Sequence, residues 1–164
     1  MECIEKNRLA FGEDHPNTFY AMNSLALFYG NHGDYERAKG LHMQCLERRR
    51  IVLGDDHSDT LSSMNNLAVL YANHEKYDEA EELYVECLEK KISLLGEDHP
   101  ETLGTVYNLA TMYANQGKFK EAEAYYSECV ERATRVLGPD HPQTKLYLHA
   151  YSQVKSRCYC CCIC

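Results

Sequence analysis

Gly12-Glu13-Asp14-His15-Pro16-Asn17-Thr18 is the first of four copies of one pattern, Gly-x-Asp-His-x-x-Thr. The later copies begin at Gly54, Gly96 and Gly138, each 42 residues after the one before. A fixed period in this range is the mark of a repeat array, whose units bury their apolar faces against neighbouring units. A residue that returns with the period is therefore expected to belong to the repeating unit and not to a unique active site.

Each unit is predicted to contain two helices. The first opens after Asp-His, with a proline in the first turn of three copies, where proline is tolerated. It continues through Leu-Ala-x-x-Tyr, whose apolar spacing of three and four is typical of one helix face. The aspartates just before these helices are expected to supply capping oxygens: Asp14, Asp56, Asp98 and Asp140.

A short turn is expected between the two helices of a unit, at Gly33, Glu75 and Gly117. Glycine suits the left-handed backbone that ends many helices. At Glu75 the same conformation would cost roughly 1–2 kcal/mol. The second helix then starts at Tyr35, Tyr77 or Phe119 and carries a solvated, charged outer face.

The period divides the chain into a repeat array over residues 1–157 and a cysteine-rich tail over residues 158–164. Residues 1–11 match the second half of a unit, and full units span about 12–53, 54–95 and 96–137. Residues 142–157 keep only part of the pattern. They are predicted to form a helix that caps the array, because an array must close its open apolar end.

The repeated Leu-Ala-x-x-Tyr, glycine turn and Tyr-x-x-Ala resemble the tetratricopeptide repeat, which usually has 34 residues. The 42-residue unit with Leu-Gly-x-Asp-His-Pro-x-Thr resembles the kinesin light chain type, as do Asn65–Tyr71 and Gly117–Glu123. The resemblance covers about residues 1–145. It implies an all-α fold, a right-handed α-solenoid of antiparallel helix pairs, with the first helix of each pair on the concave side.

The resemblance also implies that the concave side binds a partner peptide, and that the protein is a non-catalytic scaffold. Asn can donate to and accept from a peptide backbone, and Tyr adds flat contact area. On the family spacing, the expected peptide-binding residues are Tyr20, Asn23, Asn31, Asn65, Asn66, Asn73, Tyr107, Asn108 and Asn115. Leu27, Val69 and Thr111 share this face.

None of these positions is Lys or Arg, whereas family members that hold a carboxylate or an acidic motif rely on basic groove residues. We therefore expect no carboxylate clamp, and an apolar or mildly basic peptide bound with a Kd on the order of micromolar. An alternative is an architectural fragment of a larger array. Kinesin heavy chain is not expected to bind directly, because the heptad coiled coil that joins light and heavy chains is absent.

The composition bounds the class of protein. Acidic residues exceed basic ones by 25 − 17 = 8, so nucleic-acid binding is not expected. No run of eighteen apolar residues predicts a membrane span, and the charged residues 1–6 do not form a signal peptide. A cytoplasmic protein with no cofactor is the expectation, and no phosphate loop, nucleophile elbow or zinc protease motif predicts an enzyme.

Histidine and cysteine recur with the period. His15, His57, His99 and His141 are expected to cover the helix starts, because equivalent positions in stacked repeats lie about 8–10 Å apart and one zinc needs all its ligands within about 2 Å. The same distance excludes disulfides within the ladder of Cys45, Cys87 and Cys129, which are expected to act as small hydrophobes.

The tail holds five cysteines outside the period: Cys158, Cys160, Cys161, Cys162 and Cys164. Clustered cysteines near Lys155 and Arg157 are compatible with S-acylation, which would dock the array on a membrane. Two alternatives stay open. The thiolates could bind zinc or copper(I), or the segment could have no role.

Overall fold

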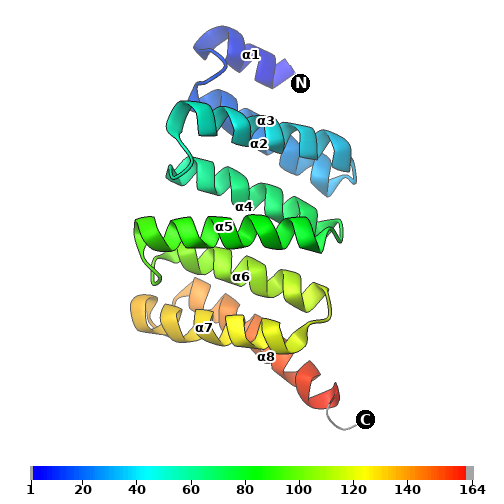
Figure 1. Ribbon diagram of the computed structural model, residues 1–164, viewed down its shortest axis with the longest axis vertical. Helices are drawn as coiled ribbons and strands as arrows, with labels where there is room; N and C mark the ends of the chain where they lie inside the picture. The colour runs from blue at the N-terminus through cyan, green and yellow to red at the C-terminus, as the bar shows by residue number, and fades with distance from the viewer. Residues whose placement is uncertain (1, 162–164) are drawn as a thin grey trace. The chain divides into compact units, whose positions relative to one another are not determined.

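The computed structural model describes residues 2–161, and the side chains of residues 4–157. Over this range the chain forms eight α-helices and no strand, which confirms the all-α prediction (Figure 1). The helices are α1 (Glu2–Phe11), α2 (Pro16–Asn31), α3 (Tyr35–Leu53), α4 (Ser58–Asn73), α5 (Tyr77–Leu95), α6 (Pro100–Asn115), α7 (Phe119–Leu137) and α8 (Pro142–Cys161). The even-numbered helices are the first helices of the repeats.

Each first helix is capped by a histidine. The Nδ1 atom of the ring accepts a hydrogen bond from the backbone N–H two residues later, at 3.2 Å for His15, 3.1 Å for His57, and 3.2 Å for His99 and His141. This satisfies one of the amides that a helix start leaves without a partner. The expectation that the neighbouring aspartates supply the cap was therefore wrong. The periodic histidines have a structural role at the helix start.

The remaining residues of the Gly-x-Asp-His-x-x-Thr pattern hold the loop closed. The Thr18 hydroxyl donates to the Gly12 carbonyl at 2.8 Å, and the Thr102 hydroxyl donates to the Gly96 carbonyl at 2.9 Å. Asp14 forms an ion pair with Arg48, with 2.6 Å between Asp14 Oδ1 and Arg48 Nη2. The threonine hydroxyl thus closes the loop in the first and third copies, whereas the buried hydroxyls of Thr60 and Thr144 have no hydrogen-bond partner among the described residues.

The turn between paired helices has the left-handed backbone that the sequence predicts. The φ angles are +79° at Gly33 and +81° at Gly117. Glu75 takes the same turn with φ at +58°, and is the one residue with a side chain at positive φ in the described part of the chain. The second repeat therefore carries backbone strain that its two neighbours avoid.

The chain divides into two compact units, residues 1–83 and 84–164, with the division inside α5. In the first unit, α2 packs against α1 and α3, and α3 packs against α4. One cluster of its core consists of buried Ile4, Phe19, Met22 and Cys45 with partly buried Ala21, Leu25 and Leu41 around them.

In the second unit, α7 packs against both α6 and α8. Its core cluster consists of Leu103, Val106, Cys129, Ala133 and Tyr147, of which Tyr147 comes from α8. The helix predicted over residues 142–157 runs on to Cys161. No helix of residues 2–161 is long and apolar enough to span a bilayer.

Candidate functional site

The first helices of the first two repeats, α2 and α4, are joined by a side-chain hydrogen bond. The Asn66 amide nitrogen donates to the Asn23 carbonyl oxygen at 3.0 Å. Gly30 of α2 lets α4 come close, because a β-carbon there would lie 3.3 Å from Leu70 Cδ1. Two of the predicted peptide-binding residues, Asn23 and Asn66, are therefore in direct contact.

A small hollow of about 40 Å³ lies between α2 and α4. Predicted residues from both helices line it: Leu27, Asn31, Asn66, Val69 and Asn73. These side chains are uncharged. The structure thus brings them together on one surface, which we call the α2–α4 face.

The predicted residues of α2 and α4 differ in exposure. Tyr20 is 74% exposed and Leu27 is 46% exposed, although both carry large apolar surfaces. Asn31 and Asn73 end their helices and are exposed, whereas Asn23, Asn65 and Asn66 are half-buried. The exposed residues are free to reach a partner, and the half-buried asparagines are engaged within the protein, Asn65 included.

In the second unit the predicted residues are less available. The Tyr107 ring stacks on Tyr147 with centroids 5.0 Å apart, and lies 5.5 Å from the Tyr126 ring. Thr111 shares a hydrogen bond of 2.8 Å with the Tyr126 hydroxyl. Asn108 is half-buried, and Asn115 is exposed at the end of α6. Tyr107 therefore packs the helices together, and Asn115 is the member of this set that faces solvent.

His42 lines the same hollow and was missed in the sequence. Its side chain is 3% exposed, and burial lowers its pKa to about 4, so the ring is neutral at pH 7. The period gave a signal, because the matching positions hold Tyr84 and Tyr126. The first repeat therefore has a histidine at a buried position where the next two repeats have tyrosine.

The periodic cysteines are not in disulfides and are almost fully buried, at 1% exposed for Cys45 and 0% for Cys87 and Cys129. Burial raises the pKa of all three, that of Cys129 to about 12. A thiol is a poor nucleophile when its thiolate is this disfavoured. These cysteines pack as small apolar residues, as predicted.

The side chains of the tail cysteines, Cys158, Cys160, Cys161, Cys162 and Cys164, lie outside the described residues, although α8 includes the backbone as far as Cys161.

Two comparisons with known proteins support the resemblance, and a third found no match. A sequence model of the Tetratricopeptide repeat matches residues 18–59, 60–101 and 102–143 in three successive copies. No curated protein matches the chain. Solved structures do match its fold.

One is a Podosopora anserina protein assigned to kinesin light chain, with nearly identical TPR-like repeats; its TM-score is 0.72 at 23% identity, over 93% of this chain and 72% of that one. Another is BtubC (BKLC) from P. vanneervenii, with a TM-score of 0.79 at 24% identity. The match covers 95% of this chain but 63% of that protein.

Tetratricopeptide repeats generally mediate protein–protein interaction, since stacked repeats present an extended binding surface. The three matched copies cover most of the chain at the period of 42 residues. The paired helices and the solenoid fold of the matched structures agree with that period. This chain belongs to the tetratricopeptide repeat family.

Proposed function

We propose that the protein is a non-catalytic scaffold that binds an extended segment of a partner protein on the α2–α4 face. The observation that carries this proposal is that Leu27, Asn31 and Asn73 are exposed and line one hollow between adjacent first helices. Tyr20 is exposed nearer the start of α2. Large apolar side chains beside amide groups are typical of peptide-binding surfaces, where apolar contacts supply affinity and amides hold the backbone.

The chemistry of the face favours a partner segment that is apolar or mildly basic. The lining of the hollow holds no acidic or basic side chain apart from the His42 and His74 rings. The chain as a whole carries a formal charge of −8. A neutral face on an acidic protein repels acidic peptides at long range and has no cation to hold them. We expect a Kd on the order of micromolar, because each contact is small.

A peptide-display selection on the intact chain tests the proposal. Selected sequences should be extended, apolar and neutral to basic. An Asn31→Ala, Asn73→Ala double variant should weaken the best peptide about tenfold, because it removes two exposed amides. A matched control, Asn17→Ala with Glu36→Ala, changes exposed residues that do not line the hollow and should bind like wild type.

Two results would overturn the proposal: a selection dominated by acidic peptides, or equal losses in the double variant and the control. Circular dichroism of all variants should show equal helicity, since both changed asparagines are exposed.

A further inference from the structure

One face of α2 is exposed, although the matching face of the later first helices is covered. Phe28 is 53% exposed, whereas the residues at its position in the later repeats are buried, at 5% for Leu70, 1% for Met112 and 6% for Val154. Ser24 is exposed, and the residues at its position are half-buried: Asn66, Asn108 and Ala150. We call Ser24 and Phe28 the leading face of α2. Neither residue lines the hollow of the α2–α4 face.

The second repeat shows what covers such a face. Asn66 of α4 donates to Asn23 of α2, and a β-carbon at Gly30 would lie 3.3 Å from Leu70 Cδ1. The preceding first helix thus meets Asn66 with a polar side chain and receives Leu70 at a small residue, seven positions later. The leading face of α2 is therefore expected to fit another first helix with the same pattern.

α8 is a first helix with this pattern on an exposed surface. The pattern lies at the positions of Asn23, Ala26 and Gly30, which we call the trailing face of a first helix. In α8 these positions hold His149, Ser152 and Ser156, and all three are exposed. The polar residue and the two small residues are therefore kept, and they are open to a partner.

The two serines of this trailing face present no free hydroxyl. Ser152 donates to the His149 carbonyl at 2.7 Å, and Ser156 donates to the Gln153 carbonyl at 2.7 Å. Hydrogen bonds of this kind tie a serine side chain to its own helix. A partner side chain can therefore cover the serines without leaving a buried polar group unsatisfied, which would otherwise cost free energy.

Charge complementarity favours α8 as the occupant. Residues 142–164 contain Lys145, Lys155 and Arg157 and no acidic residue. Residues 1–83, which include α2, contain 8 basic and 15 acidic residues, a net charge of 8 − 15 = −7. Opposite charges on two surfaces speed their encounter and disfavour the wrong orientation. The basic end of one copy is thus drawn to the acidic first unit of another.

α1 adds a second contact for a helix docked on α2. Glu2–Phe11 match Gln44–Leu53 by the period, so α1 has the sequence of a second helix. The second helix α3 packs against a first helix on each side, α2 and α4. α1 packs against α2 in the same way and can receive another first helix. On α8 this contact would cover Leu148, which is 50% exposed where the matching Val106 is 4% exposed.

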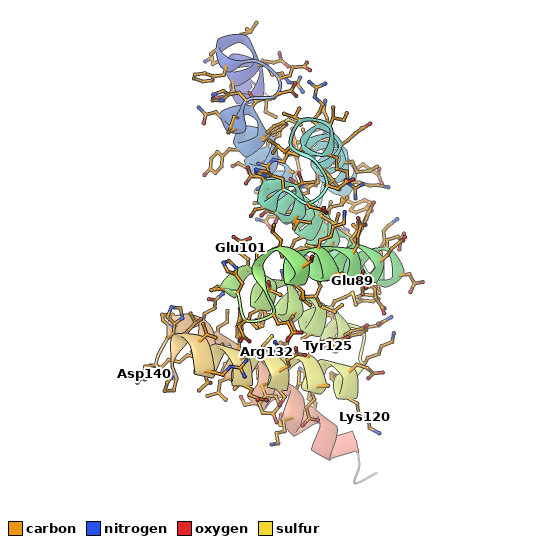
Figure 2. The ribbon with its side chains drawn as sticks, turned by 60° about the vertical axis from the view of Figure 1, so that its left-hand side comes forward. Glu89, Glu101, Lys120, Tyr125, Arg132 and Asp140 are labelled. Atoms are coloured by element: carbon orange, nitrogen blue, oxygen red, sulfur yellow. The ribbon has the colours of Figure 1, made fainter. Side chains whose placement is uncertain are left out.

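One residue of α8 opposes a tight contact. Lys145 stands at the position of Leu103, which is fully buried. Its amine pairs at 3.0 Å with Asp140, which is labelled in Figure 2 in the loop before α8. The amine can stay at the rim while its apolar stem is covered. This position therefore adds little to the affinity.

We propose that the chain associates head to tail, with the trailing face of α8 in one copy packed against the leading face of α2 in the next. Phe28 of the next copy covers Ser152 and Ser156, and its Ser24 faces His149. Because the two faces differ, the contact does not close on a two-fold axis and further copies can be added. The contact is smaller than a standard interface of roughly 1,600 Å², and we expect a Kd weaker than about 10 μM.

Sedimentation equilibrium of the full chain under reducing conditions tests the contact, since reduced cysteines cannot link copies covalently. The average mass of wild type should rise with concentration. Phe28→Glu puts a charge on the leading face and Ser156→Trp fills the trailing face, and each should weaken association at least tenfold. Both residues are exposed, so both variants should keep the wild-type melting temperature. Wild type that stays monomeric up to about 1 mM, or association that either variant leaves unchanged, would overturn the proposal.

A mixture of the two variants tests the direction of the contact. Phe28→Glu keeps an intact α8, and Ser156→Trp keeps an intact leading face. Together they should form a dimer and nothing larger, because the remaining pair of intact faces joins one copy of each. A mixture that stays monomeric would contradict the proposal. So would Ser156→Trp that dimerises alone through α2, or Phe28→Glu that dimerises alone through α8.

Matched controls change residues of similar exposure elsewhere. Leu94→Glu alters a side chain that is 51% exposed at the end of α5, and Ser127→Trp enlarges an exposed serine of α7. Both should associate like wild type, and losses equal to those of Phe28→Glu and Ser156→Trp would remove the assignment to α2 and α8. Asn31→Ala with Asn73→Ala should also leave association unchanged, so failure of the α2–α4 proposal is distinguishable from failure of this one.

Discussion

The side-chain amide of Asn66 donates a hydrogen bond of 3.0 Å to the side-chain carbonyl of Asn23, and so joins the first helices of two successive repeats. Both residues are partly shielded from solvent. The two asparagines therefore link the first helices of the first two repeats. The effect of an Asn66 substitution on protein stability must therefore be measured before any loss of binding is attributed to the surface.

Asn66→Ala should lower the free energy of unfolding by about 1 kcal/mol, because it leaves the half-buried Asn23 oxygen without its donor. Asn73→Ala removes an exposed amide at the end of the same helix and should change stability by less than about 0.5 kcal/mol. Urea unfolding followed by circular dichroism measures both. Equal midpoints for the two variants would show that the bond makes no net contribution.

His57→Ala should cost about 1 kcal/mol, because the ring of His57 accepts the Asp59 amide at 3.1 Å and alanine offers no acceptor. His57→Asn is the matched control, since its side-chain oxygen can cap the same helix. It should retain most of the wild-type stability in thermal unfolding. If both variants lose the same amount of stability, His57 stabilises the protein through the packing of its ring and not through its hydrogen bond to the helix start.

The histidine cap shows where prediction from sequence succeeded and where it stopped. The period predicted the helices, the turns and the placement of histidine at each helix start. It did not separate Asp14 from His15 as the cap, because both residues recur and both can accept a hydrogen bond. The choice depends on side-chain direction, and Asp14 is drawn to Arg48, which lies 34 residues further along the chain.

The exposure of the candidate binding residues could not be predicted from their spacing. Spacing alone places a residue on the first helix, but exposure depends on what the neighbouring helix presents to it. Tyr20 is exposed, whereas Tyr107 is packed against Tyr147 of α8. A comparison of equivalent positions in the repeats is more informative than spacing. His42 and Gly40 differ from the residues at the equivalent positions of the other repeats, and both line hollows.

His42 should make stability depend on pH. Burial lowers its folded-state pKa from 6.5 to about 4, so the unfolded chain takes up a proton first as the pH falls. The stabilisation that the neutral His42 ring gives the folded state is complete above pH 6.5 and is lost as the pH falls from 6.5 to 4. At about 1.4 kcal/mol per pKa unit, the loss amounts to roughly 3 kcal/mol.

Unfolding of wild type and His42→Phe across pH 4–7 measures this loss. Phenylalanine cannot titrate, so the variant should lose less stability than wild type over that range. His42→Tyr is the control, because tyrosine stands at the matching positions of the next two repeats and stays protonated below pH 7. Parallel pH profiles for all three proteins would contradict the assignment to His42.

Glu75→Gly should stabilise the protein. Glu75 has φ at +58°, where the other two turns have Gly33 and Gly117. Relief of the left-handed strain contributes roughly 1–2 kcal/mol, and the greater freedom of glycine in the unfolded chain removes roughly 0.5–1 kcal/mol of it. The net gain should be about 0.5–1 kcal/mol, seen as a higher urea midpoint. Glu75→Ala keeps the β-carbon and should gain little, so an equal gain in both variants would place the effect in the lost carboxylate and not in the backbone.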